Sequence, residues 1–226
     1  MKRICAVLLL AVITVIASAS PISGLLERID RGASKKFIIE EVKSDTDFFE
    51  LDQKGSRVVI RGNNSVSIAT GLNWYLKYYA GIHLSWNGMT ATLPDVLPPV
   101  MKKERHETKL PWRYDLNYCT YSYSMAFWDW ERWEKEIDWM ALHGINLPLA
   151  ITGTETVWYN VLQKLGYNKT EINEFISGPG FFAWWLMNNL EGWGGPNPDH
   201  WYTQQVSLQK KILKRMHEYG IEPVLP

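Results

Sequence analysis

The chain has 226 residues, with 24 basic and 24 acidic side chains, a formal net charge of zero and 46% hydrophobic residues. This composition is typical of a globular protein, and no low-complexity segment stands out. The balanced charge, without a polybasic run, excludes a surface built for nucleic acid or for anionic lipid.

Residues 1–19 have the three parts of a secretory signal peptide: a basic start at Lys2 and Arg3, an apolar run, and the small residues 17–19. The apolar run of about a dozen residues is shorter than the roughly 20 that cross a bilayer, so a cleaved signal is favoured over a retained anchor. We therefore expect a secreted or periplasmic protein, lysosomal if it comes from an animal, that makes no membrane contact after cleavage. Cleavage would leave Cys119 as the only cysteine, which excludes an internal disulfide.

Residues 20–100 have the pattern of a small α/β domain. Apolar residues recur at helical spacing in its first and last elements, and short apolar runs bounded by polar turns predict strands between them. The charged stretch 101–111, which follows Pro98 and Pro99, reads as a linker out of this domain. The expected helices cover 22–35 and 65–79, and the expected strands cover 37–39, 48–51 and 57–61.

From Trp112 onward, longer strands and helices alternate, which predicts a parallel α/β sheet. Two helix-to-strand joints repeat the order Met, Gly, Ile, with Gly144 and Gly220 placed where a helix commonly ends on a left-handed residue. Trp130 and Trp133 lie on the helix face that should pack against the sheet. The expected strands cover 113–118, 147–151 and 223–225, and the expected helices cover 129–143, 156–165 and 204–219.

This sheet could belong to an open doubly wound fold or to a closed barrel. No glycine-rich dinucleotide loop follows any expected strand, which favours the barrel. An eight-unit barrel needs about 250 residues, so residues 112–226 supply only its first part. The predicted fold class is therefore α/β: a small N-terminal α/β domain followed by the first part of a (β/α)8 TIM-type barrel, with the chain ending before the barrel is complete.

Three polar or aromatic residues follow the first expected barrel strand. Asn117, Cys119 and Tyr123 alternate there, so they could share a face that points into the barrel mouth, where such enzymes have their sites. An amide, a thiol and a phenol beside an apolar wall suit a neutral polyol. The alternative is that the tyrosines of this segment are core aromatics with satisfied hydroxyls.

Glu155 follows the second expected barrel strand. Its carboxylate could hold a sugar hydroxyl, or it could simply be an acidic residue in the first turn of a helix, where the helix dipole favours it. Downstream, residues 181–196 are too rich in large apolar side chains for a simple connector. This segment must either pack down as a lid or present its rings to a ligand.

Several common chemistries are excluded by spacing. No His, Cys or carboxylate cluster has metal-ligand spacing, and neither a G-x-S-x-G elbow nor a phosphate loop is present. Cys119 as a nucleophile would need a positioned base, and the five histidines form no linked motif. We therefore expect neither a cofactor nor a metal.

Several long and unusual strings follow one another in the second half of the chain. They are NYCTYSY at 117–123, WDWERWEKEIDWMAL at 128–142, GINL at 144–147, EINEF at 171–175, Gly178-Pro179, and FAW at 182–184. In this order they resemble alpha-N-acetylglucosaminidases, which form glycoside hydrolase family 89, and the resemblance covers roughly residues 22–226. It implies an N-terminal α/β domain, a (β/α)8 barrel and a C-terminal helical region, and cleavage of terminal alpha-linked N-acetylglucosamine from glycans, including heparan-type polysaccharide, with retention.

The resemblance also implies which residues contact the sugar. The matching positions here are Asn117, Cys119, Tyr123, Trp184 and Met187, and Glu155 is a further candidate from its position alone. The family's catalytic pair consists of two glutamates on later barrel strands, beyond Pro226, so no catalytic residue is assigned in this chain. The alternatives are a non-catalytic carbohydrate-binding or scaffold protein and an inactive truncated fragment. The oligomeric state is not predicted.

Overall fold

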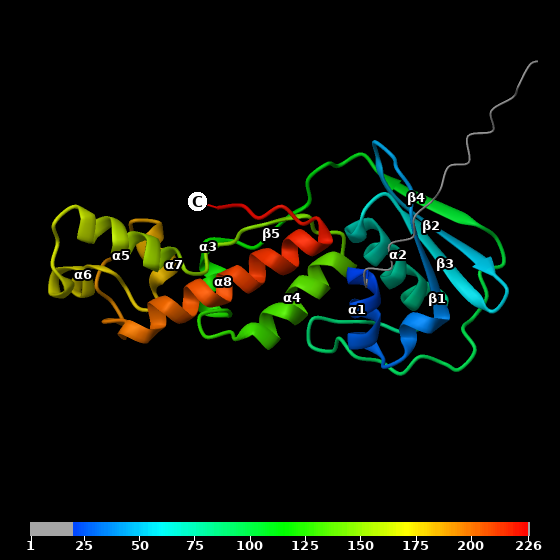
Figure 1. The fold of residues 1–226 in the computed structure, drawn as a ribbon, viewed down its shortest axis with the longest axis horizontal. Helices are drawn as coiled ribbons and strands as arrows, with labels where there is room; N and C mark the ends of the chain where they lie inside the picture. The colour runs from blue at the N-terminus through cyan, green and yellow to red at the C-terminus, as the bar shows by residue number, and fades with distance from the viewer. Residues whose placement is uncertain (1–19, 226) are drawn as a thin grey trace, which may run out of the picture.

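A computed structural model describes residues 20–225, which form two units side by side (Figure 1). The signal peptide expected over residues 1–19 lies outside the described residues. Within residues 20–225, no helix is both long and apolar enough to span a bilayer. The first unit is a sheet covered by two helices, and the second contains two long helices beside a short parallel sheet.

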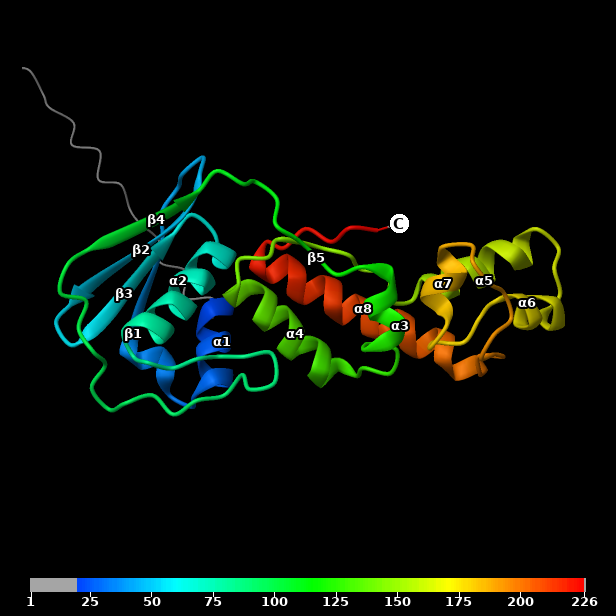
Figure 2. The same ribbon diagram turned by 180° about the vertical axis from the view of Figure 1, so that it is seen from behind.

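The first unit is a four-stranded sheet with the strand order β1-β3-β2-β4. The pair β1 and β3 is parallel, and the other two pairs are antiparallel. Helices α1 and α2 lie between this sheet and the second unit (Figure 2). The bounds are Pro21–Ile29 for α1, Ser65–Tyr78 for α2, Phe37–Glu41 for β1, Asp47–Lys54 for β2, Arg57–Gly62 for β3 and Glu104–Thr108 for β4.

Two expectations for this unit were wrong. The helix expected over 22–35 ends at Ile29, because the backbone of Asp30 is extended with φ −151°, and a separate 3₁₀ turn follows at Ala33–Lys36 after the left-handed Gly32. The stretch 101–111, expected to be a linker, contains β4, which pairs antiparallel with β2. β4 is an edge strand of the sheet, and charged side chains are typical of exposed edges. Its composition therefore resembles that of a linker.

The second unit begins as a parallel sheet, as expected. β5 (Tyr114–Asp115) pairs in parallel with β6 (Leu147–Pro148), and Leu149 makes a parallel bridge to Val224. The expected strands 113–118, 147–151 and 223–225 are therefore much shorter in the structure. Both predicted joints are confirmed, because Gly144 and Gly220 are left-handed with φ 77° and 73°.

The helices of the second unit are α3 to α8. The helix expected from Asp129 is confirmed, because the Asp129 side chain caps it by accepting a hydrogen bond from the Arg132 amide. Helix α6 was not expected, although Asn168 and Glu171 form a capping box at its start. The bounds are Tyr118–Tyr123 for α3, Trp130–Leu142 for α4, Thr154–Lys164 for α5, Lys169–Phe175 for α6, Phe182–Leu186 for α7 and Asp199–Tyr219 for α8.

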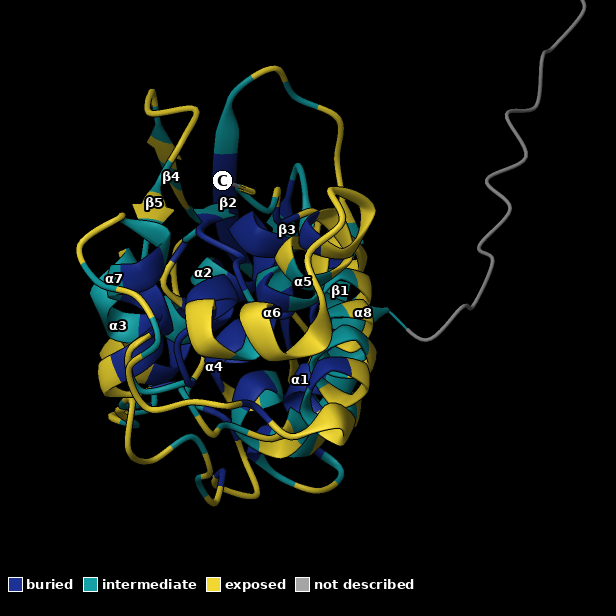
Figure 3. Ribbon diagram, turned by 90° about the vertical axis from the view of Figure 1, so that its left-hand side faces the viewer, coloured by how far each residue is buried: buried dark blue, intermediate teal, exposed yellow. Residues whose placement is uncertain are grey.

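One hydrophobic core runs through both units. Trp133, Ile137 and Met140 of α4 are almost fully buried and join the same core as α1 and α2, whereas Trp130 is only partly buried. Buried residues are concentrated where α1, α2 and α4 meet, and α6 is mostly exposed (Figure 3). Trp133 is thus buried as expected, but the contacts of α4 are mainly with the helices α2 and α8, so the expectation that this face packs against the sheet was wrong.

Candidate functional site

The segment after β5 folds into a helix rather than a longer strand. Leu116 has a left-handed backbone, φ 70°, which is uncommon for a residue other than glycine and turns the chain out of the strand. Asn117 then caps α3, because its Oδ1 accepts hydrogen bonds from the Thr120 amide and the Thr120 hydroxyl, each at 3.0 Å. Asn117, Cys119 and Tyr123 therefore do not alternate along a strand, and that expectation was wrong.

Helix α3 has two chemically different faces. Cys119 and Tyr123 are four residues apart and share one face, while Tyr121 and Met125 share the opposite face. Tyr121 is buried and its hydroxyl donates to the Leu149 carbonyl, which ties the helix to the chain after β6. Tyr123 is 79% exposed. The alternative of a satisfied core tyrosine thus holds for Tyr121 and not for Tyr123.

Helix α7 is attached to α3 through a serine. The Ser122 hydroxyl donates to the Pro179 carbonyl and accepts from the Ala183 amide, each at 3.0 Å. This attachment places the Trp184 ring edge-on to the Tyr123 ring, with 4.9 Å between centroids and an angle of 85°. Met187 follows directly as the C-terminal cap of α7.

The aromatic-rich segment both packs down and presents rings. Phe182 and Trp185 are buried in a small core with residues of α5 and α6, whereas Trp193 is 63% exposed. Close backbone contacts hold the segment: the Gly178 amide donates to the Trp193 carbonyl at 2.8 Å, and a Cβ on Gly178 would lie 1.9 Å from the Gly194 oxygen. Part of the segment therefore packs down, and other rings of it remain exposed.

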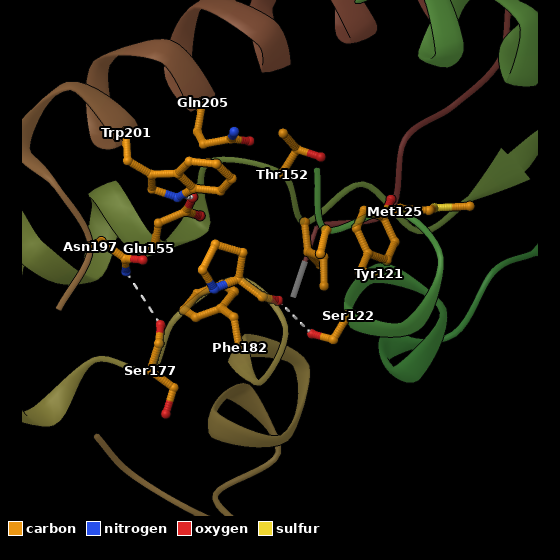
Figure 4. Close-up of a pocket in the computed structure, with 14 residues that line it drawn as sticks. Tyr121, Ser122, Met125, Thr152, Glu155, Ser177, Phe182, Asn197, Trp201 and Gln205 are labelled. Carbon is orange, nitrogen blue, oxygen red and sulfur yellow. Dashed lines mark hydrogen bonds between the residues drawn. The ribbon is translucent and has the colours of Figure 1, made fainter. Parts of the chain in front are cut away.

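Glu155 lies in a separate pocket on the Tyr121 side of α3 (Figure 4). It is in the first turn of α5, it is only 5% exposed, and its carboxylate accepts a hydrogen bond of 2.8 Å from the indole nitrogen of Trp201. Burial raises the pKa of the Glu155 carboxyl above its usual range, and hydrogen bonds from nearby backbone amides and from Trp201 only partly oppose this. The pocket encloses about 410 Å³, counting the part open to solvent.

The structure thus divides the six predicted site residues between two places. Asn117, Cys119 and Tyr123 lie on α3 and Trp184 and Met187 on α7 and its cap, while Glu155 faces the other pocket. No spacing in the sequence indicates the partner of Glu155, because Trp201 is 46 residues away and lies on α8. The other polar residues that line the Glu155 pocket are Ser122, Thr152, Ser177, Asn197 and Gln205.

The pocket around Glu155 has one acidic group. Among residues 20–225, Glu155 is the one carboxylate that lines it. Within residues 20–225, no group of three or more His, Cys, Asp or Glu side chains is arranged to hold a metal ion. The aromatic and amide groups suit hydrogen bonding and stacking with a neutral ligand better than they suit metal chemistry.

Comparisons with known proteins identify both units. Sequence models of the alpha-N-acetylglucosaminidase N-terminal domain and tim-barrel domain match residues 20–99 and 113–226. Human alpha-N-acetylglucosaminidase is 46% identical over 185 residues, which are 81% of this chain and 25% of the human protein.

Solved structures agree with the sequence matches. A family 89 glycoside hydrolase from Clostridium perfringens, solved in complex with 2-acetamido-1,2-dideoxynojirmycin, is 42% identical and superposes with a TM-score of 0.84 over 89% of this chain and 23% of its own. The same match is found for a variant of the C. perfringens protein in complex with its substrate GlcNAc-alpha-1,4-galactose.

The chain spans about a quarter of the length of these relatives. The comparisons confirm the predicted fold class, an N-terminal domain followed by the first part of a TIM-type barrel, and the sheet of the second unit does not close within the described residues. The resemblance inferred from the sequence is confirmed as well. The chain belongs to the alpha-N-acetylglucosaminidase family.

Proposed function

We propose that the protein is a retaining exo-glycosidase that removes terminal alpha-linked N-acetylglucosamine from glycans, and that this chain supplies part of its substrate pocket. Family membership supports this assignment, as does the disaccharide substrate of the C. perfringens relative. The signal-peptide pattern of residues 1–19 supports a secreted or periplasmic location, and the balanced charge supports a protein that contacts neither membrane nor nucleic acid.

The observation that carries the proposal is the aromatic pair of Tyr123 and Trp184. The two rings come from α3 and α7, and α3 directly follows the C-terminal end of β5, where barrel enzymes have their sites. Their perpendicular arrangement offers a flat apolar face and a phenol hydroxyl at one corner, which suits a pyranose ring with its alternating C–H and O–H groups.

The neighbouring residues would complete the contacts to the sugar. The Oδ1 atom of Asn117 is used in capping α3, so the proposed contribution of Asn117 to the sugar is its amide nitrogen as a donor. Cys119 lies on the Tyr123 face of α3, and the thioether of Met187 supplies a soft apolar contact. Glu155 belongs to the neighbouring pocket, where we assign it a supporting role.

A retaining mechanism needs two carboxyl groups about 5 to 5.5 Å apart, one as the acid and one as the nucleophile. Glu155 alone cannot serve both roles, and it is the one carboxylate lining its pocket. The family resemblance implies two catalytic glutamates on later barrel strands, so we propose that they lie beyond Pro226 and that these 226 residues alone are inactive.

A chromogenic alpha-linked N-acetylglucosaminide tests the proposal directly. We expect turnover from a longer chain that includes later barrel strands and none from residues 1–226. Robust turnover by the shorter chain would refute the assignment of the catalytic groups. Absence of turnover in both would refute the enzyme proposal.

The second candidate is a glycan-binding protein without catalysis. It is favoured because, among the described residues, Glu155 is the one carboxylate that lines the pocket next to the proposed sugar contacts. Calorimetric titration of the 226-residue chain with N-acetylglucosamine separates the two. A true binding module should bind the sugar tightly on its own, whereas part of a barrel should bind it weakly.

A further inference from the structure

Two asparagines of the chain lie in the sequence Asn-x-Ser/Thr, to which a eukaryotic secretory pathway attaches N-linked glycans. They are Asn63, within residues 63–65, and Asn168, within residues 168–170. Neither belongs to the proposed sugar contacts, and the sequence alone does not distinguish them. The structure does distinguish them, through the hydrogen bonds of the two side-chain amides.

The side-chain amide of Asn63 is occupied at both of its polar atoms. Its Nδ2 donates to the Asp47 carboxylate at 2.9 Å, and its Oδ1 accepts from the Phe48 amide at 3.1 Å and from the Ser67 hydroxyl at 3.0 Å. The same carboxylate pairs at 2.7 Å with Arg113, which directly precedes β5. Asn63 is half-buried, so a glycan on its Nδ2 would have to leave this junction past the groups that the amide contacts.

The side-chain amide of Asn168 is occupied at one polar atom. As the N-terminal cap of α6, its Oδ1 accepts from the backbone amides of Thr170 at 2.9 Å and of Glu171 at 3.1 Å. Within residues 20–225, no hydrogen bond of this side chain uses Nδ2. An N-linked sugar is attached through Nδ2 and leaves the carbonyl oxygen unchanged, so a glycan here would keep both capping bonds.

The surroundings of Asn168 leave room for a large substituent. All residues from 163 to 171 are exposed, and they cover the turn between α5 and α6. This turn lies at the end of the second unit that is farthest from the N-terminal sheet, and α6 is mostly exposed (Figures 1 and 3). A glycan attached here would therefore extend into solvent and away from the buried core of residues 20–225.

We propose that Asn168 is an N-glycosylation site in a eukaryotic secretory pathway and that Asn63 is not. In the transfer step, a bond forms between Nδ2 of Asn168 and C1 of the N-acetylglucosamine in a lipid diphosphate-linked oligosaccharide. The bond from that C1 to the diphosphate oxygen breaks, the lipid diphosphate leaves, and Nδ2 gives up one proton. The proposal rests on the secreted location proposed above and not on the glycosidase activity.

Secretion of the full-length protein from cultured eukaryotic cells tests this assignment, with the signal peptide of the host in place of residues 1–19. Peptide N-glycosidase in heavy-oxygen water converts each glycosylated asparagine to labelled aspartate, and mass spectrometry of the peptides measures the two positions separately. We expect the label at Asn168 in most molecules and at Asn63 in almost none. An unlabelled Asn168, or label at Asn63 as high as at Asn168, overturns the assignment.

Matched variants separate the acceptor sequence from the helix cap. Thr170→Ala should abolish the label at Asn168, whereas Thr170→Ser keeps the acceptor sequence and should keep the label. Ser65→Ala removes the other acceptor sequence and should leave the glycan content unchanged. Asn168→Asp should lose the glycan but keep a capping oxygen, so its urea midpoint should equal that of the glycosylated wild type. A lower midpoint in the wild type would show that the glycan disturbs the cap.

Failure of this proposal is distinguishable from failure of the proposed function. Turnover of an alpha-linked N-acetylglucosaminide by the same secreted sample measures the glycosidase activity, whereas the label measures the modification. Absence of secretion with the native residues 1–19 would refute the proposed location, while the label obtained with the signal peptide of the host still decides the site. If that protein is retained in the cell, the same peptides are analysed from the membrane fraction, where an unlabelled Asn168 overturns the assignment equally.

Discussion

The two units of the chain obtain their stability in different ways. The N-terminal sheet has strands of five to eight residues with continuous pairing, whereas β5 and β6 have two residues each and the third strand is a single bridge. The second unit is held instead by α4, which buries its apolar face against α2, and by α8, which packs on α4. The second unit is therefore stabilised largely by its contact with the first. Of the two rings proposed to contact the sugar, Tyr123 is exposed and Trp184 is half-buried.

A polar cluster joins α1, α4 and α8. Arg28 of α1 makes two hydrogen bonds to Asp138 of α4, at 2.6 and 2.8 Å, and the Tyr219 hydroxyl of α8 donates to Asp138 at 2.7 Å. Asp138 is only 3% exposed, so these partners replace the water contacts that its carboxylate loses on burial. The following variants test the contrast between the buried contact and the exposed site.

The largest effect is expected for Trp133→Ala. This ring is 1% exposed at the centre of the shared core, and removing it should lower the free energy of unfolding by about 4 kcal/mol. Urea denaturation measures the change. Trp112→Ala, at a largely exposed tryptophan, should change it by less than about 0.5 kcal/mol. Equal losses in both variants would contradict the division into a buried contact and an exposed surface.

Arg28→Ala should cost about 3 kcal/mol, because it leaves the buried carboxylate of Asp138 without its main partner. Arg215, at 3.9 Å from Asp138, limits the loss. Adding Asp138→Asn to this variant should recover part of the stability, since it removes the uncompensated charge. Arg31→Ala, at an exposed arginine, serves as the control. A double variant less stable than Arg28→Ala would count against the electrostatic explanation.

Glu155→Gln should change the pH dependence of stability. The pKa of Glu155 is raised in the folded protein from a usual value near 4.5, so between these two values the folded state binds more protons than the unfolded state. Wild-type stability is therefore lost as the pH rises through that window. Glutamine keeps an acceptor for Trp201 and carries no charge, so the variant should gain stability relative to wild type as the pH rises.

Urea titrations at several pH values measure this difference. Glu131→Gln, at a side chain that is 76% exposed, controls for the loss of one negative charge. A difference between Glu155→Gln and wild type that stays constant with pH would show that burial does not govern this carboxyl.

The smallest effect on stability is expected for Tyr123→Ala. Because the ring is 79% exposed, the free energy of unfolding should change by less than about 0.5 kcal/mol. Affinity for N-acetylglucosamine should fall about fivefold, from the loss of roughly 1 kcal/mol of ring contact. Calorimetry and urea denaturation on the same sample separate the two effects, and unchanged affinity would remove Tyr123 from the site.

Features set by local chemistry could be predicted from the sequence. Gly144 and Gly220 end their helices as expected, since a left-handed residue at the end of a helix is usually glycine and can be recognised in the sequence. The helix after Asp129 was predicted from the helical spacing of its apolar residues, which is also a local pattern. By contrast, Asn117 was placed on a strand, although a capping side chain competes locally with strand pairing and turned the chain into α3.

Features set by distant contacts could not be predicted. β4 depends on pairing with a strand some fifty residues earlier, and its own residues look like those of a solvated linker. The pairing of Glu155 with Trp201 depends on how α5 meets α8, which no spacing encodes. That Tyr123 and Trp184 belong to one site was expected from the family resemblance. No pattern in the residues themselves predicts that they meet.

The single hydroxyl of Ser122 has a consequence for the thermodynamics of sugar binding. By joining α3 to the start of α7, it closes a long excursion of the chain when the protein folds, so the entropy of ordering that excursion is lost before any ligand arrives. At the proposed site, a sugar that contacts Tyr123 and Trp184 then meets two rings already held at a fixed angle. Its affinity is diminished mainly by its own loss of freedom and very little by that of the protein.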